Sequence, residues 1–127
     1  MQAIINVELD TKAGPGLSVE DRYALVLASL RKFFTRAIGE VRAVSYEGPE
    51  GQVTESTAVI TFEFHAPKSV VLSAATQISR AFNQDCVAVL FDDGEGRLVG
   101  PEADRWGGFK IEYFKRPAFF EILKAAA

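Results

Sequence analysis

The strongest constraint on the fold is a strictly alternating stretch, STAVITFEFH, at residues 56–65. Apolar side chains recur at every second position, which is the period of a β-strand. One face of this strand would carry Ala58, Ile60, Phe62 and Phe64. The other face would carry Thr57, Val59, Thr61 and Glu63. Because only one face is strongly apolar, the pattern predicts a sheet covered by helices on one side and open on the other.

The remaining segments follow from their periodicity and from the turn residues between them. Strands are expected at residues 2–9, 40–47 and 85–91, and helices at 19–39 and 68–84. The resulting order is β-α-β-β-α-β. It predicts an α+β fold: a ferredoxin-like sandwich, with an antiparallel sheet and both helices on one face. An extended segment from Phe109 and a short helix from Pro117 would follow at the C-terminus.

The first helix has recognisable end signals. Ser18 is a suitable N-cap, with Asp21 three residues later, and Gly39 is a suitable stop. Leu30 lies on the apolar stripe of this helix and is expected to meet Phe62 in the core. Leu25 and Phe33 are expected to widen the same apolar face.

The composition limits the class of protein. A chain of 127 residues with 48% hydrophobic and 24% charged residues is typical of one globular domain, residues 1–127. The net charge of −3 argues against binding to nucleic acid or to an acidic membrane. No leader-like segment and no apolar run of about 18 residues is seen, and there is a single cysteine. A cytoplasmic protein is therefore expected.

Residues 90–109, LFDDGEGRLVGPEADRWGGF, form the least ordinary stretch of the chain. The spacing G-x-G-x-x-x-G follows a predicted strand, but no helix start follows it, so a phosphate cradle is disfavoured. Asp92, Asp93 and Glu95 lack the spacing of a calcium loop, and a solvated hairpin explains them as well. With one cysteine and one histidine in the chain, neither a metal site nor a cofactor is predicted.

A surface for a protein partner is the main hypothesis for this stretch. Aromatic and basic residues alternate from residue 105 onwards, and tryptophan, tyrosine and arginine are enriched at interface hot spots. The predicted contact residues are Trp106, Arg105, Phe109, Tyr113, Asp92, Asp93 and Glu95. The chain as a whole is similar to small proteins carried by phages and other mobile elements, and no motif ties it to a named family. The predicted function is a non-enzymatic binding or accessory protein of inhibitor type. Its partner would be another protein, with a homodimer as a further hypothesis.

A second hypothesis is a small enzyme or ligand-binding protein with a cavity on the open sheet face. Glu8 and Glu63 could be neighbours on the two central strands, where like-charge repulsion would raise one pKa. With His65 they would supply acid–base chemistry. A dyad of Cys86 and His65 is disfavoured because their strands would not pair. RNA recognition is disfavoured because the outward face carries no aromatic residue on which a base could stack.

Overall fold

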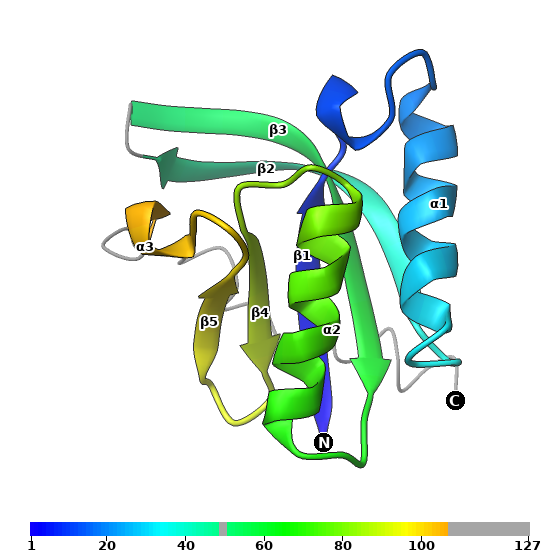
Figure 1. The fold of residues 1–127 in the computed structure, drawn as a ribbon, viewed down its shortest axis with the longest axis vertical. Helices are drawn as coiled ribbons and strands as arrows, with labels where there is room; N and C mark the ends of the chain where they lie inside the picture. Colours follow the sequence, from blue (N-terminus) through cyan, green and yellow to red (C-terminus); the bar gives the residue numbers. More distant parts are fainter. Residues whose placement is uncertain (49–50, 107–127) are drawn as a thin grey trace.

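The structure is a computed structural model and describes residues 1–48 and 51–106. Figure 1 shows a sheet with two long helices packed against it. The elements in chain order are β1 (Gln2–Glu8), a short 3-10 helix (Thr11–Ala13), α1 (Val19–Arg31), β2 (Ile38–Gly48), β3 (Gly51–Glu63), α2 (Lys68–Ala81), β4 (Val87–Phe91), β5 (Gly96–Val99) and α3 (Ala103–Trp106).

The sheet has five strands in the order β2-β3-β1-β4-β5, and each neighbouring pair is antiparallel. This confirms the α+β class. The predicted order contained four strands, and the fifth strand, β5, lies in the return of the hairpin expected within residues 90–109 and was not counted in that order. Its four residues are too short a run to show a period of their own. Figure 1 shows α1 and α2 on the same face of the sheet.

The first helix is shorter than predicted. Its start is as expected, because Ser18 Oγ accepts a hydrogen bond from the Asp21 N–H at 3.1 Å. The helix ends at Arg31, however, and Gly39 lies in β2. A Cβ at this glycine would lie 2.7 Å from Ile60 Cγ1 and 2.9 Å from the Val59 carbonyl oxygen. Gly39 therefore permits a close approach of two strands and is not a helix stop.

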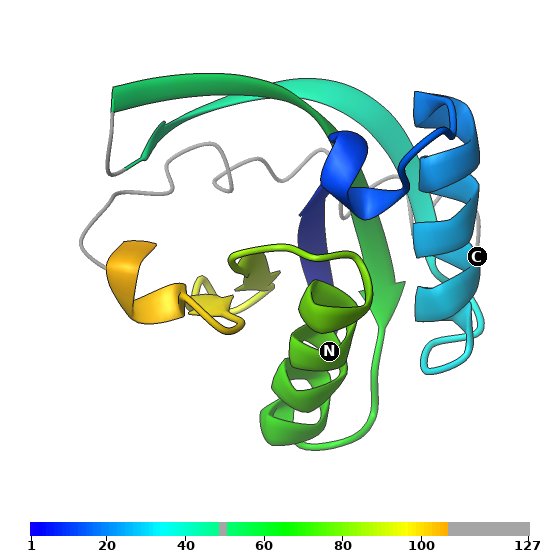
Figure 2. The same ribbon diagram turned by 45° about the horizontal axis from the view of Figure 1, so that its top comes forward.

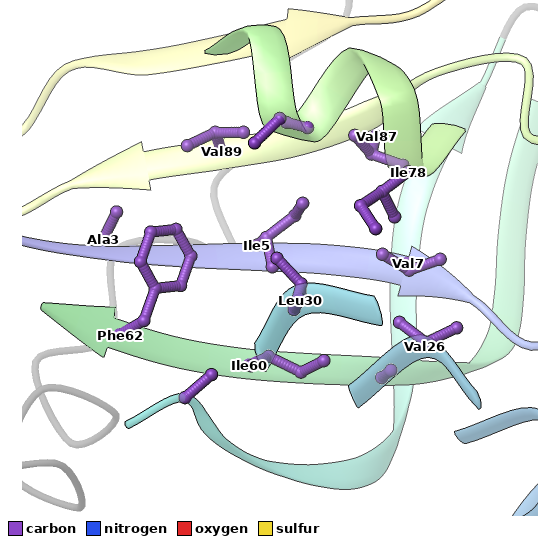
Figure 3. Close-up of a cluster of buried hydrophobic side chains, with 14 of the residues drawn as sticks. Ala3, Ile5, Val7, Val26, Leu30, Ile60, Phe62, Ile78, Val87 and Val89 are labelled. Atoms are coloured by element: carbon purple, nitrogen blue, oxygen red, sulfur yellow. The ribbon is translucent and has the colours of Figure 1, made fainter. Parts of the chain in front are cut away.

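The core lies between the helices and one face of the sheet (Figure 3). Leu30 of α1 and Phe62 of β3 belong to this one buried cluster, as predicted, and are 0% and 1% exposed. The ring of Phe34 stacks on that of Phe62 at 4.2 Å between centroids. Leu25 and Phe33 instead face outward, with 47% and 44% exposure, so the prediction that they widen the apolar face was wrong.

The second face of the sheet is buried at its centre as well. Ile4, Val59 and Thr61 are 1%, 3% and 2% exposed, so the prediction of an open face was wrong. Val44 of β2 packs against Ile4 and Val59. Figure 2 shows the long β2–β3 hairpin curving away from the rest of the sheet. Across the described ranges, no helix combines the length and apolar character needed to cross a membrane.

Candidate functional site

The second face of the sheet carries polar side chains at the end of β1. Asn6 and Glu8 share this face, because alternate residues of a strand point to the same side. Thr57 of β3 pairs directly with Glu8. Two further carboxyl groups, from Asp10 and Glu55, interact with that of Glu8. We call these five residues the β1 site.

Asn6 is the most unusual residue of the β1 site. It is 7% exposed, and its Oδ1 has no hydrogen-bond partner. Among the side chains that the structure describes, at residues 1–45, 51 and 54–105, no other buried nitrogen or oxygen lacks one. Such an acceptor costs a folded protein about 1–3 kcal/mol. Because buried polar groups are otherwise almost always paired, this oxygen points to a donor that the folded chain does not itself supply.

Glu8 has a strongly shifted acidity. Burial, together with the neighbouring carboxyl groups of Asp10 and Glu55, raises the pKa of its carboxyl group to about 9. Glu8 is therefore protonated at neutral pH and can donate a hydrogen bond. Carboxyl groups perturbed by burial and like charge are concentrated at functional sites.

The end of β1 is held in place by two buried polar side chains. Gln84 is 6% exposed, accepts a hydrogen bond from the Glu8 N–H at 3.2 Å and donates to the Phe82 carbonyl at 3.0 Å. Arg22 of α1 donates to the carbonyl groups of Leu9 and Gly14 at 3.1 and 3.0 Å. These hydrogen bonds hold the backbone at Glu8 and Leu9 before Asp10 and at Gly14 after it. The positions of the Glu8 and Asp10 carboxyl groups are therefore constrained.

Cys86 lies near the same end of the sheet, just before β4. Burial raises the pKa of its thiol to about 12, and the charges of Asp85, Glu102 and Glu8 act in the same direction. The thiol is therefore neutral at physiological pH. Because the thiolate is the nucleophilic form, Cys86 is not set up for nucleophilic catalysis.

The acid–base group predicted from the sequence is not brought together. In the β1–β3 ladder Glu8 pairs with Thr57, whereas Glu63 pairs with Gln2 at the opposite end. Six residues of strand separate the two carboxylates, or about 20 Å. His65 follows β3 at the Glu63 end and is exposed. The prediction that Glu8 and Glu63 are neighbours was therefore wrong, because the sequence does not reveal the register of the ladder.

The acids of residues 92–95 form a second cluster, at the turn between β4 and β5. The predicted hairpin is confirmed, since these two strands pair. Lys68, at the start of α2, contacts the carboxylate of Asp93 and that of Glu95, the latter at 2.7 Å. Arg97 Nε lies 2.9 Å from Glu95 Oε1. We call these four residues the turn cluster.

The turn cluster is neutralised within the chain. The Lys68 ammonium group lowers the pKa of both Asp93 and Glu95, and Arg97 lowers that of Glu95 as well. Asp92 accepts a hydrogen bond from the Gln2 N–H at 3.0 Å. These acids join α2 and β1 to the β4–β5 turn, which is a structural role.

The other predicted contact residues lie at the end of the described chain. Arg105 belongs to α3, with its Nη1 at 3.8 Å from Glu102 Oε2. Trp106 is the last residue of α3, and Phe109 and Tyr113 lie outside the described residues. Contact of these residues with a partner stays a prediction. In the described part of the chain, no three His, Cys, Asp or Glu side chains are grouped so that they could hold a metal ion.

The sequence interpretation missed Asn6, Asp10 and Glu55 as site residues. A signal existed for Asn6, because it is an amide within the otherwise apolar strand AIINVEL. None existed for Glu55, which precedes the predicted strand at residues 56–65, whereas β3 begins at Gly51.

No protein-family model matches this chain, and no curated protein does. Two solved structures are similar in fold. One is a phage SAM lyase in complex with S-methyl-5′-thioadenosine, with a TM-score of 0.57, 22% identity, and coverage of 77% of this chain and 87% of that one. The other is a phage SAM lyase in the apo state, with a TM-score of 0.51, 21% identity, and coverage of 69% and 75%.

This likeness contradicts the predicted function. The similar structures are those of an enzyme, whereas the sequence led us to expect a non-enzymatic protein of inhibitor type. The expectation failed because it weighed the aromatic stretch after residue 105 and the lack of a familiar catalytic motif. The polar side chains of the β1 site come from two segments that are far apart in the sequence, so no single motif could reveal the site.

Proposed function

We propose that this protein is a small enzyme or ligand-binding protein whose ligand is a thioadenosine nucleoside, bound at the β1 site. The observation that carries the proposal is the buried Oδ1 of Asn6, which lacks a donor. The amino and hydroxyl groups of such a nucleoside are donors of the required kind. The fold likeness to a lyase solved with S-methyl-5′-thioadenosine supports this ligand class.

Glu8 gives the site a chemical capacity beyond binding. A half-buried carboxyl group with a pKa of about 9 is protonated at neutral pH and can act as a general acid. Once a cationic ligand approaches, the ionised form of the same group is favoured. S-adenosylmethionine is a cation and S-methyl-5′-thioadenosine is neutral. A carboxyl group that changes its charge can therefore distinguish these two ligands.

We also propose that the architecture is a ferredoxin-like one with an added edge strand. The support is the order of the first four strands, β2-β3-β1-β4, with both long helices on one face. In this interpretation β5 extends the sheet beside β4.

The proposal is tested by calorimetric titration of the full chain with S-methyl-5′-thioadenosine and S-adenosylmethionine. We expect binding of both, and a loss of at least about tenfold in the affinity for S-adenosylmethionine in Asn6→Leu, which keeps the shape but removes the acceptor. Glu63→Gln is the matched control, because Glu63 lies at the far end of the same ladder. Its affinity should equal that of the parent.

Formation of S-methyl-5′-thioadenosine from S-adenosylmethionine is then followed by chromatography. Production that depends on Glu8 would establish the enzymatic form of the proposal. Absence of binding by either nucleoside, or equal affinities for the parent and Asn6→Leu, would contradict the proposal.

A further inference from the structure

Two hydrogen-bonding groups lie side by side in the β1 site. Asn6 and Glu8 are alternate residues of β1, so their Cα atoms lie roughly 6–7 Å apart and their side chains share a face. The Asn6 oxygen is an acceptor without a donor. The Glu8 carboxyl group becomes an acceptor as soon as it loses its proton. At this spacing, a single ligand group admitted to the buried face can contact both.

The chemistry of these two groups selects the ligand group. An anion is disfavoured because the carboxyl groups of Asp10 and Glu55 also face Glu8. A metal ion is disfavoured because no suitable group of ligands exists among the described residues. A sulfonium group carries positive charge but has no N–H, so it leaves the Asn6 oxygen unpaired. An ammonium group supplies both the charge and three donors.

We propose that the β1 site holds its ligand through a primary ammonium group, placed between the Asn6 carboxamide oxygen and the Glu8 carboxyl group. This inference rests on the proposed function and extends it, because it names the part of the ligand that the site recognises. The amino-acid portion of a nucleoside such as S-adenosylmethionine carries such a group, whereas S-methyl-5′-thioadenosine does not.

Binding of an ammonium group should change the protonation state of Glu8. The pKa of Glu8 is raised to about 9, so the free protein carries a proton there at neutral pH. An ammonium group beside it favours the ionised form, so binding releases that proton. The affinity should then rise with pH up to about pH 9, by at most about tenfold per pH unit.

Several other ionisable groups among the described residues lie on the elements around Glu8. Asp10 follows β1, Glu55 lies on β3, and Asp85 and Cys86 precede β4. Glu102 acts on Cys86 from the segment after β5. On the described part of β2, Arg42 pairs with Thr57 across the β2–β3 ladder, and its Nε lies 3.6 Å from Glu40 Oε1. Cys86 does not contribute to the proton release below pH 9, because its own pKa is raised to about 12.

The test compares two thioether nucleosides without net charge, of which only one carries an amino-acid portion with its ammonium and carboxylate groups. S-adenosylhomocysteine has an amino-acid portion, and S-methyl-5′-thioadenosine has only a methyl group. Each is titrated into the full chain by calorimetry at pH 7, in two buffers of different ionisation enthalpy. We expect close to one proton released for the first nucleoside and none for the second.

Two variants and a control make the test specific. Glu8→Gln should abolish the proton release, and Asn6→Leu should weaken binding of S-adenosylhomocysteine more than that of S-methyl-5′-thioadenosine. Glu63→Gln should leave both properties unchanged. Binding of both nucleosides without proton release, or binding of S-methyl-5′-thioadenosine alone, would overturn the inference and leave the proposed function standing. Failure of both nucleosides to bind would overturn the two together.

Discussion

The β1 site and the turn cluster are both rich in acids, and they differ in what surrounds those acids. At the turn, Lys68 and Arg97 lie within hydrogen-bond distance of the carboxylates and lower their pKa values. At the β1 site, burial and neighbouring carboxyl groups raise the pKa of Glu8 to about 9. The first arrangement stabilises the fold, whereas the second keeps a carboxyl group in an unfavourable state. Acidic residues therefore become informative about function only when their partners are known.

The largest loss of stability is expected in the core that supports both regions. Leu30→Ala should lower the free energy of unfolding by about 2–5 kcal/mol, because it empties a fully buried position in the helix–sheet cluster. A urea melt measures this value. A loss below about 1 kcal/mol would place Leu30 outside the core. The assignment of the core that supports both the β1 site and the turn cluster would then be wrong.

The sharpest difference between the two regions should appear in the pH dependence of stability. The folded pKa of Glu8 is raised, so its contribution is fully present below pH 4.5 and is lost as the pH rises towards 9. One fully linked proton would give about 1.4 kcal/mol per pH unit. Since the carboxyl group is only half-buried, we expect about half of that or less. Urea melts at pH 5, 7 and 9 test this slope.

The matched variants for this slope are Glu8→Gln and Glu63→Gln. The first should flatten the fall in stability between pH 5 and pH 9, and the second should leave it in place. A parent protein whose stability does not fall over this range would show that Glu8 is ionised in the folded chain. The contrast with the turn cluster would then disappear.

Removing the unpaired acceptor should stabilise the protein. Asn6→Leu keeps the side-chain shape and removes the buried oxygen that has no donor, so we expect a gain of about 1 kcal/mol in the free energy of unfolding. Thermal melts of the parent and the variant, without any added nucleoside, give the difference. A clear loss of stability would mean that the carboxamide is already satisfied in the folded chain.

The smallest effect is expected at the turn cluster. Lys68→Met removes the cation from exposed carboxylates, and exposed ion pairs contribute little. We expect a fall in melting temperature of about 3 °C or less at pH 7. Because the folded pKa values of Asp93 and Glu95 are lowered, the difference should vanish as the pH falls below their usual range. Lys68 Nζ also lies 4.8 Å from the centroid of the Phe91 ring, so a difference that persists at pH 2 would point to the loss of this contact instead.

Much of the fold could be predicted from local patterns. The alternation around Ile60 and the capping pattern at Ser18 are properties of neighbouring residues, and the structure confirms both. Gly39 was misread because its role is set by Ile60 and Val59 on another strand. Exposure of Phe33 depends equally on where α1 ends.

The candidate site was far less predictable, and the reason is register. Whether Glu8 lies near Glu63 or near Glu55 depends on the register of the β1–β3 pair. The sequence of either strand alone does not determine this register. The burial of Asn6 depends on the whole second face of the sheet. The acids at residues 92–95 were predicted as contact residues because they are close together in the sequence. That closeness does not reveal that Lys68 and Arg97 pair with them.

The central position of β1 has a consequence for synthesis on the ribosome. Its two partners are β3 and β4, and Ala3 pairs with Phe62 on one side and Phe91 on the other. At about 5–20 residues per second, β1 waits roughly 4–18 s for its second partner to be made. During that interval an apolar strand has one or both edges unpaired, and such edges invite aggregation. This protein should therefore be sensitive to the rate of translation and to the supply of chaperones during expression.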